Sequence, residues 1–124
     1  MMTLRILSFS AAVIMLVACD PSVKNEKEAI SAVKKILIDP SSAQFEGLFN
    51  PDPSKKPSKA IKLDANDVCG MVNSKNRFGG YVGATMFHYS YEDKHVLIVD
   101  GADDMSPELA EVMRQAIKFR CTLI

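Results

Sequence analysis

An apolar run from Ile6 to Val17 most limits what this chain can fold into, because it sets the N-terminus apart from the folded domain. Arg5 precedes the run, and the small residue Ala18 follows it. A secretory signal needs a basic start, an apolar stretch of about 7–15 residues and small residues at its cleavage site. The run is too short to cross a bilayer, which takes about 20 apolar residues. We therefore expect residues 1–18 to be a signal peptide.

The run ends in the tetrapeptide Leu16-Val17-Ala18-Cys19, which resembles the lipobox of bacterial lipoproteins. The resemblance implies that the preceding peptide is removed and that Cys19 becomes the lipidated N-terminus of a membrane protein, with palmitate among its acyl chains. One acyl chain holds a protein only marginally, so we expect more than one. The alternatives are an ordinary thiol after a simple secretion signal and a short membrane anchor.

The residues after Cys19 predict where the protein resides. An aspartate in the next position resembles the inner-membrane retention signal of enteric bacteria, and Asp20 holds that position. Residues 19–22 form a tether that reaches about 10–15 Å when extended, so the domain should lie close to the headgroups. We expect a lipid anchor on the periplasmic face of the cell membrane, with the inner membrane favoured over the outer.

The mature chain, residues 19–124, is long enough for one compact domain and too short for two. The full chain has 15 basic residues (Lys+Arg) and 15 acidic ones (Asp+Glu), and the signal peptide contributes only Arg5 to these counts. The mature part is therefore close to neutral. Proteins that bind nucleic acid usually carry an excess of basic residues, and the mature part has none. We therefore exclude nucleic acid as a partner.

Two cysteines, Cys69 and Cys121, remain once Cys19 is assigned to the lipid. Disulfides form and persist in exported proteins, so we expect these two to pair. The bridge would close a loop of about 50 residues, which the chain-entropy model credits with roughly 4 kcal/mol. Two free buried thiols or a redox pair are the alternatives, although the chain has no Cys-x-x-Cys and matches no zinc module.

The first half of the domain is predicted to hold one helix and one short strand. Ser22 caps a helix over residues 23–38, and Asp39-Pro40 ends it because the residue before proline avoids helical geometry. The helix is recognised by apolar residues at spacings of three or four: Ala29, Ile30, Val33, Ile36 and Leu37. Residues 40–45 form a short helical turn, after which a strand delivers Phe45, Leu48 and Phe49 to the core. Residues 50–59 are a loop by composition.

In the second half, strands are predicted over residues 60–72, with a break near 64–67, and over residues 81–91 and 95–100. A tight turn at residues 92–94 joins the last two. Ser106 and Pro107 begin a C-terminal helix whose predicted buried stripe is Leu109, Val112, Met113, Ala116 and Ile117. We expect residues 23–124 to form one α+β domain, a small antiparallel sheet of three or four strands with both helices on one face.

Residues 69–83, CGMVNSKNRFGGYVG, are the most unusual stretch of the mature chain. Glycine permits backbone geometries closed to other residues, and asparagine offers both a donor and an acceptor. Such a loop can bind a polar ligand or the backbone of a partner. The candidate binding residues are Asn73, Lys75, Asn76, Arg77, Phe78 and Tyr81. The stretch does not match the phosphate-binding template Gly-x-x-x-x-Gly-Lys.

This stretch and a segment upstream of it together form a sequence pattern that resembles known proteins. The pattern consists of Asp39-Pro40-Ser41-Ser42-Ala43-Gln44-Phe45, then Cys69-Gly70, Asn73, Lys75-Asn76, Phe78-Gly79-Gly80-Tyr81 and Gly83. It resembles a group of small uncharacterised exported bacterial proteins, which implies a shared domain and no particular activity. The alternative interpretation is that residues 73–80 are only a tight connection, with Phe78 and Tyr81 in the core.

No residues match a catalytic or metal-binding template. Ser74 and Ser90 lack the Gly-x-Ser-x-Gly elbow of hydrolases. His88 and His95 flank the predicted hairpin and could meet across it, but two histidines match no metal spacing, even with Glu92 or Asp93. The conceivable acids and bases are Asp64, Asp67, Asp100, Asp103 and Asp104, in stretches typical of turns. We therefore predict no enzyme, no metal and no cofactor.

A basic run of four lysines follows the first strand: Lys55, Lys56, Lys59 and Lys62. Near an anionic leaflet each lysine contributes about 1 kcal/mol, so this run could press the domain onto the membrane. A solvated surface loop is the simpler interpretation, since the intervening prolines already explain its polarity.

Three functional hypotheses follow. The first is a lipid-anchored envelope protein that binds a protein or cell-wall partner through residues 73–81, as an inhibitor, an immunity or exclusion factor, or part of an envelope machine. The second is a hydrolase of cell wall or a small molecule, which requires acidic residues with perturbed pKa values in a cleft. The third is a structural accessory subunit of an envelope complex, with neither a cleft nor a local interaction site.

Overall fold

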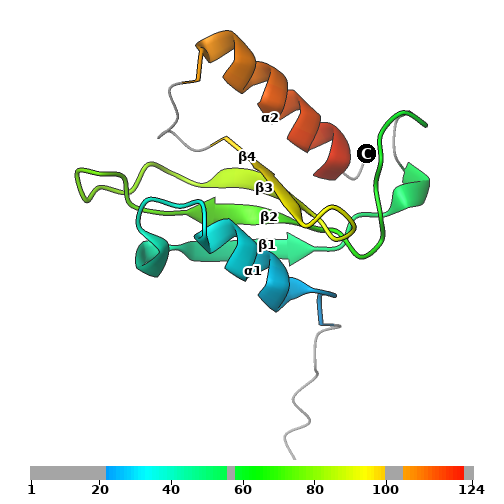
Figure 1. The fold of residues 1–124 in the computed structure, drawn as a ribbon, viewed down its shortest axis with the longest axis horizontal. Coiled ribbons are helices and arrows are strands. Elements are labelled where there is room, and N and C mark those ends of the chain that lie inside the picture. Colours follow the sequence, from blue (N-terminus) through cyan, green and yellow to red (C-terminus); the bar gives the residue numbers. More distant parts are fainter. Residues whose placement is uncertain (1–21, 56–57, 100–104, 122–124) are drawn as a thin grey trace, which may run out of the picture.

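A four-stranded antiparallel sheet lies between two helices in the computed structural model, which describes residues 22–55, 58–99 and 105–121 (Figure 1). The strands lie in sequence order, each beside the one before it. The elements are α1 (Glu26–Lys34), β1 (Gln44–Phe49), β2 (Val68–Asn73), β3 (Thr85–Ser90), β4 (His95–Ile98) and α2 (Pro107–Cys121). The predicted α+β class is confirmed. The predictions for the signal peptide, Cys19 and Asp20 lie outside the described residues.

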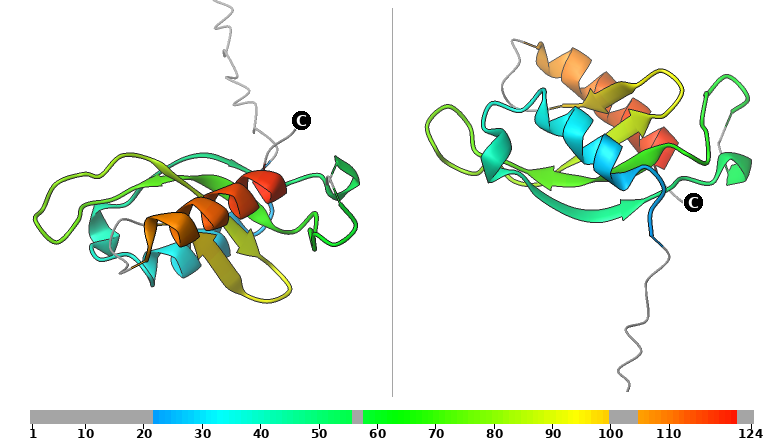
Figure 2. Two further views of the ribbon diagram at one scale, coloured as in Figure 1. Left: turned by 90° about the horizontal axis from the view of Figure 1, so that it is seen from above. Right: turned by 60° about the horizontal axis from the view of Figure 1, so that its bottom comes forward.

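The two helices cover opposite faces of the sheet (Figure 2). Val33 of α1 packs in one cluster with Phe87, whereas Ile117 of α2 packs in the other with Cys69 and Val99. Successive residues of a strand point to opposite faces, and β2, β3 and β4 place apolar side chains on both. The prediction of both helices on one face is wrong, because that arrangement would leave one apolar face in water.

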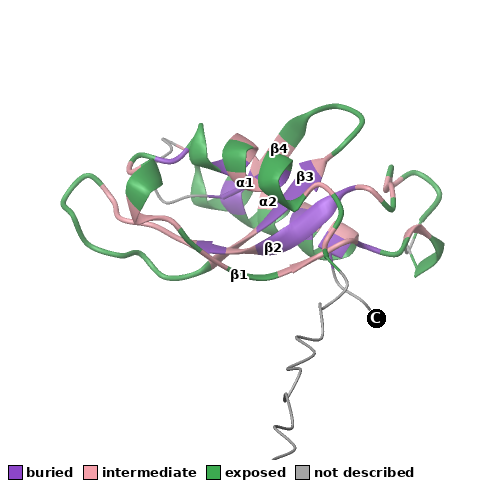
Figure 3. Cartoon of the chain, turned by 90° about the horizontal axis from the view of Figure 1, so that it is seen from below, coloured by how far each residue is buried: buried purple, intermediate pink, exposed green. Residues whose placement is uncertain are grey.

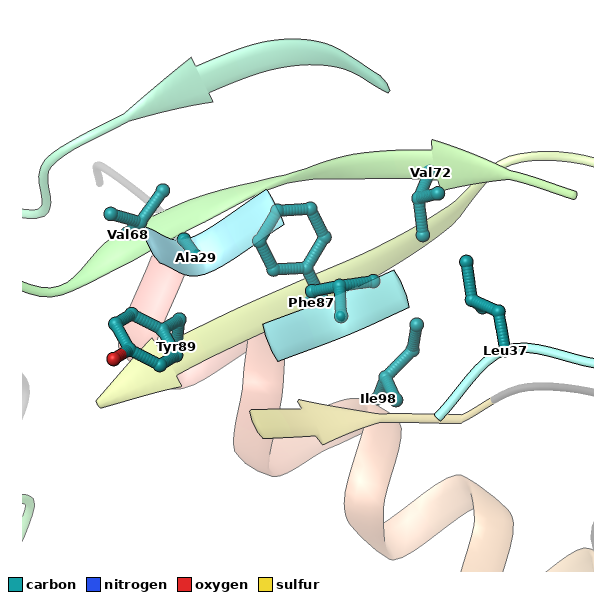
Figure 4. Packing of buried hydrophobic residues seen from close by; sticks show 8 residues of the cluster. Ala29, Leu37, Val68, Val72, Phe87, Tyr89 and Ile98 are labelled. Carbon is teal, nitrogen blue, oxygen red and sulfur yellow. The ribbon is translucent and has the colours of Figure 1, made fainter. Parts of the chain in front are cut away.

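The core beneath α1 is built around Phe87, whose side chain is fully buried (Figure 4). Its ring meets the Phe45 ring edge to face, with centroids 5.9 Å apart. Gly70 lies directly across from Phe87 in the β2–β3 register. A Cβ at Gly70 would come within 3.1 Å of both Phe87 and Leu48, so glycine makes room for these side chains.

Helix α1 begins at Glu26 rather than at the predicted Val23, because Asn50 binds both backbone polar groups of Lys24. The Asn50 amide donates to the Lys24 carbonyl at 3.0 Å, and its Oδ1 accepts the Lys24 N–H at 2.8 Å. The residue before the helix, Asn25, then adopts a left-handed φ of 61°, which asparagine tolerates. The helix ends at Lys34, short of the predicted Ile38.

Strand β1 contains an extra residue that decides which side chains reach the core. Its pairing with β2 slips between Glu46 and Phe49, and Gly47 has a φ of 62°, a conformation that favours glycine. This bulge places Phe45 and Leu48 against the α1 cluster and Phe49 against the α2 cluster. The predicted helical turn before this strand, at Pro40–Ser42, is confirmed, as is the delivery of these three residues to the core.

The other strands are shorter than predicted. Strand β2 begins at Val68, so residues 60–67 are irregular instead of extended. The Asp64 carboxylate accepts the N–H of Asn66 at 2.8 Å, which folds this segment into a turn. Strand β3 begins at Thr85, which leaves residues 81–84 in the preceding loop. The predicted tight turn between β3 and β4 is confirmed.

Helix α2 starts where the sequence predicts, but it is rotated from the predicted orientation. Ser106 Oγ accepts the N–H of Leu109 at 3.2 Å, and Pro107 is the first helical residue. The predicted stripe is wrong at Leu109 and Val112, which are 51% and 65% exposed. The side chains that face the sheet are those of Ala110, Met113, Ile117 and Cys121. The bond from Cys121 to the sheet fixes this rotation.

The predicted disulfide is confirmed between Cys69 of β2 and Cys121 in the last turn of α2. Their Cα atoms are 5.7 Å apart, and 52 positions separate them in the sequence. Both residues are buried, so the bond belongs to the core beneath α2. Free thiols at these positions are excluded. Among residues 22–55, 58–99 and 105–121, no helix has the length and apolar character that a membrane crossing requires.

Candidate interaction hairpin

Residues 74–84 form a loop that joins β2 to β3 and projects beyond the sheet (Figure 1). An isolated antiparallel bridge between Lys75 and Tyr81 continues the β2–β3 pairing into this loop. We call residues 73–84 the interaction hairpin, since they include every residue of the predicted partner-binding loop.

Two asparagines hold the backbone of the interaction hairpin. Oδ1 of Asn76 accepts the N–H groups of Phe78 at 2.9 Å and Gly80 at 3.1 Å, and the Asn76 N–H donates to the Gly80 carbonyl at 2.9 Å. Oδ1 of Asn73 accepts the N–H of Gly83 at 3.1 Å. The oxygens of both side chains are therefore used inside the loop. In this respect the interpretation as a tight turn is correct.

Ser42, in the segment before β1, makes two hydrogen bonds to the base of the hairpin. Its Oγ accepts the N–H of Lys75 at 2.9 Å, and its carbonyl accepts the Tyr81 hydroxyl at 3.1 Å. Sequence reasoning did not assign Ser42 to the site. The only signal was that residues 39–45 and 69–83 occur together in the resemblance pattern, and the structure brings these two segments into contact.

The outer part of the hairpin, residues 77–84, is exposed (Figure 3). Phe78 is 96% exposed at the tip, and Tyr81 and Val82 are about half exposed. The alternative interpretation, with Phe78 and Tyr81 in the core, is therefore wrong. The ammonium group of Lys75 lies 5.6 Å from the centre of the Tyr81 ring, within cation–π range. The tip thus combines a fixed backbone with an apolar side chain in water.

The charge of the interaction hairpin has one sign. It contains Lys75 and Arg77 and no acidic residue. Arg77 is exposed beside Phe78, whereas Lys75 lies nearer the base. Aromatic residues and arginine are the residue types enriched at the centres of protein interfaces. The hairpin can therefore offer an apolar anchor with a cation at its side.

The chain enters the domain at the opposite end of the sheet from this hairpin (Figure 1). The Asn50 side chain that binds Lys24 also donates to the carbonyl of Asp67 at 2.8 Å, directly before β2 begins. The interaction hairpin leaves from the other end of β2, after Asn73. The described chain therefore begins, at residue 22, at the end of the sheet remote from Phe78.

A second polar group lies buried at that entry end. Asp67 and His88 are 2% and 3% exposed, and the Asp67 Oδ2 lies 2.9 Å from Nε2 of His88. Burial raises the pKa of Asp67, but hydrogen bonds from His88 and from the backbone N–H groups of Tyr91 and Asp64 lower it more. The net pKa lies below the ordinary value, so the carboxyl group is ionised. Since a carboxylate only accepts, Nε2 of His88 carries the proton.

The other ring nitrogen of His88, Nδ1, is buried and has no hydrogen-bond partner among the described residues. A buried polar atom left without a partner costs about 1–3 kcal/mol. His88 also lines a small cavity, together with His95. The two histidines lie on one face of the sheet but are not directly opposite, because His88 pairs with Leu97 and His95 pairs with Ser90.

The remaining predicted side chains are dispersed. Lys62 makes ion pairs of 3.4 Å with Glu92 and Asp93, so it is engaged at the β3–β4 turn, and Lys55 and Lys59 are exposed. No group of three or more metal-binding side chains occurs within the described ranges. The predictions at Lys56, Asp100, Asp103 and Asp104 concern residues that are not described.

Comparison with known proteins adds no relative: no family model matches the chain, and neither a curated protein nor a solved structure does. The resemblances to the lipobox and to exported bacterial proteins stay predictions. The functional argument therefore depends on the chain's own residues.

Proposed function

We propose that this protein is a lipid-anchored component of the cell envelope that binds a protein partner through the interaction hairpin. The observation that carries the proposal is Phe78, which is 96% exposed at the tip of a loop whose backbone is fixed by Asn76. Tyr81 and Val82 of the same ordered loop are also about half exposed, and a group of exposed apolar side chains is typical of an interface.

The partner should offer an apolar pocket with an acidic rim. Phe78 would fill the pocket, and Arg77 and Lys75 would face the acidic groups, since the hairpin has no negative charge of its own. Aromatic anchors at interface centres cost about 2 kcal/mol or more when truncated. Because Asn76, Asn73 and Ser42 already order the loop, binding loses little conformational entropy.

The position of the hairpin suits an anchored receptor. With Cys19 lipidated, the short tether would hold the entry end near the membrane, while the hairpin leaves from the opposite end of the sheet. An inner-membrane anchor after Asp20 would place this hairpin in the periplasm. An inhibitor, an immunity or exclusion factor, and a subunit of an envelope machine would each use such a surface.

Site-specific photo-cross-linking in the native cell, followed by mass spectrometry, tests the proposal. With a photoreactive residue in place of the half-exposed Val82 of the same hairpin, we expect one dominant protein adduct, which is lost in Phe78→Ser. The matched control is Val112→Ser, which removes another exposed apolar side chain, on α2, and should leave the adduct unchanged. Both variants should keep their thermal midpoints, because surface substitutions change stability by about 0.5 kcal/mol or less.

Two results would count against the proposal. An adduct that persists when Asn73, Lys75, Asn76 and Arg77 are replaced together would remove the hairpin from the interface. Equal loss in Phe78→Ser and Val112→Ser would show that apolar exposure in general, and not this loop, drives the contact. A Cys19→Ala variant adds a separate test of the anchor, since it should release the protein from the membrane fraction.

A further inference from the structure

Helix α2 carries apolar side chains on a side that does not face the sheet. We call four of its residues the outer stripe: Leu109, Val112, Ala116 and Phe119. Ala116 is half-buried, and the other three are at least half exposed. An α-helix turns by about 100° per residue, so these positions lie within about 80° of one another around its axis. The outer stripe is therefore one apolar face in contact with solvent, on a helix whose other side packs on the sheet.

The spacing of the outer stripe is typical of the seam between two paired helices, where apolar residues alternate at three and four positions. The order three, four, three is the same in both directions and is centred on Arg114. When two copies of α2 run antiparallel about that centre, Leu109 lies opposite Phe119 of the second copy, and Val112 lies opposite Ala116. A parallel pair would instead set Ala116 against Ala116 and Phe119 against Phe119, which fills the seam less evenly.

The charges of α2 also favour the antiparallel arrangement. The first half of the helix carries Glu108 and Glu111, and the last turn carries Lys118 and Arg120. An antiparallel pair places the acidic half of each copy beside the basic half of the other, whereas a parallel pair places like charges together. Glu111 already contacts Arg114 at 3.6 Å. Within the described residues, Glu108 and Lys118 make no ion pair, so both are available to a second copy.

We propose that the outer stripe binds a second copy of this protein, with the two α2 helices antiparallel about a twofold axis near Arg114. The same residues meet from both copies, so the contact closes at two molecules. Stable interfaces use about 20–30 residues from each side, many more than the stripe offers, so the pair is weak in dilute solution. Anchors in one membrane, as proposed above, would raise the effective concentration and favour pairing.

The antiparallel arrangement determines where the two interaction hairpins lie. Helix α2 runs from the hairpin end of the sheet towards the β3–β4 turn (Figure 1). Arg114 lines a cavity with Val82 of the hairpin, and Arg120 lines another with Asp93 of the turn. The two hairpins of a pair would therefore leave from opposite ends of the helix pair. The pairing goes beyond the proposed hairpin function and does not depend on it.

Photo-cross-linking of the full chain in the native cell tests the pairing and its direction. A photoreactive phenylalanine analogue in place of Phe119 keeps the aromatic ring, and we expect it to link two copies. Trypsin cuts after Arg114, so the linked peptides reveal the orientation. In the antiparallel pair the label joins the peptide that ends at Arg114 and contains Leu109. In a parallel pair the label would join a peptide that follows Arg114.

Charge reversal supplies a second arm. Lys118→Glu should reduce the linked dimer about threefold or more, because it sets acidic groups together at both ends of the pair. The matched control is Lys34→Glu, the same change in the last turn of α1, which should leave the dimer unchanged. The double variant Glu108→Lys, Glu111→Lys should also lose the dimer. Coexpression of the two reversed chains should restore it as a mixed pair, which also shows that each variant still folds.

A last variant separates this proposal from the hairpin function. Val112→Ser should lose the linked dimer and keep the hairpin adduct, whereas Phe78→Ser should do the reverse. Four results overturn the pairing: no link between two copies, a link only to peptides after Arg114, equal loss in Lys118→Glu and Lys34→Glu, and no restoration by coexpression. A link from position 119 to a different protein in place of a second copy overturns it as well.

Discussion

Asparagine and aspartate side chains bind backbone groups at both ends of the sheet. At one end these contacts include a buried carboxylate, and at the other they leave an apolar side chain exposed to solvent. At the entry end, Asn50 and Asp67 bind backbone groups from distant parts of the chain, and Asp67 is buried. At the hairpin end, Asn76 binds only its own loop and leaves Phe78 in water. The entry end therefore connects distant segments of the chain, whereas the hairpin end exposes a side chain to solvent. Their responses to substitution should differ accordingly.

Asp67→Ala should have the largest effect, a loss of about 3 kcal/mol or more in the free energy of unfolding. Removing one partner of a buried pair leaves the other uncompensated, which costs about 3–5 kcal/mol. Here His88 and two backbone N–H groups would lose their acceptor. Urea unfolding of the purified protein measures the loss. Asp64→Ala, whose carboxylate binds only within its own turn, serves as the control. Equal losses would contradict a special role for Asp67.

Asn50→Ala should cost about 2 kcal/mol, because three hydrogen bonds of roughly 1 kcal/mol each are lost and water replaces part of them. Two of the three fix Lys24 before α1, and the third holds the carbonyl of Asp67. Hydrogen exchange should therefore accelerate at Ala29, whose N–H makes the first helical bond to Asn25. Unchanged exchange at Ala29 would show that α1 forms without the hydrogen bonds of Asn50.

Acid should destabilise the entry end through Asp67. A carboxyl group with a lowered pKa in the folded state stabilises the protein above its ordinary pKa, about 3.9. That contribution is lost as the pH falls from about 4 through the lower folded pKa. Asp67→Asn should be less stable at neutral pH, and its stability should fall less steeply below pH 4. The interaction hairpin has no acidic residue, so it adds nothing to this dependence.

Asn76→Ala should have the smallest effect on global stability, about 1 kcal/mol or less, because its hydrogen bonds lie in an exposed loop. The loop itself should loosen. Amide exchange at Phe78 and Gly80 should accelerate, while exchange in β2 and β3 stays the same. Acceleration throughout the sheet would show that the hairpin supports the fold after all.

Local signals in the sequence located most of the elements. Ser106 and Pro107 placed the start of α2, because a cap and its first turn lie within a few residues. The disulfide was predicted because disulfides form in exported proteins and because two cysteines remain once Cys19 is assigned to the lipid. Each of these inferences needs only neighbouring residues or a count of cysteines.

The wrong predictions concern features that are determined by residues far away in the sequence. Asn50 lies 26 positions from Lys24, so no periodicity before α1 could show that the helix starts late. The rotation of α2 depends on Cys121 reaching Cys69 across the sequence. The sequence left Phe78 open between a binding loop and the core, because an aromatic residue beside glycines fits both and no local signal shows that the loop projects.

The bulge at Gly47 also has a consequence for how copies of the protein meet. Strand β1 lies at the edge of the sheet, and an open, regular edge invites a strand from another molecule. The extra residue breaks the spacing of its backbone groups between Glu46 and Phe49, so a second copy finds no continuous ladder to extend. The bulge therefore disfavours edge-to-edge association of two copies through β1.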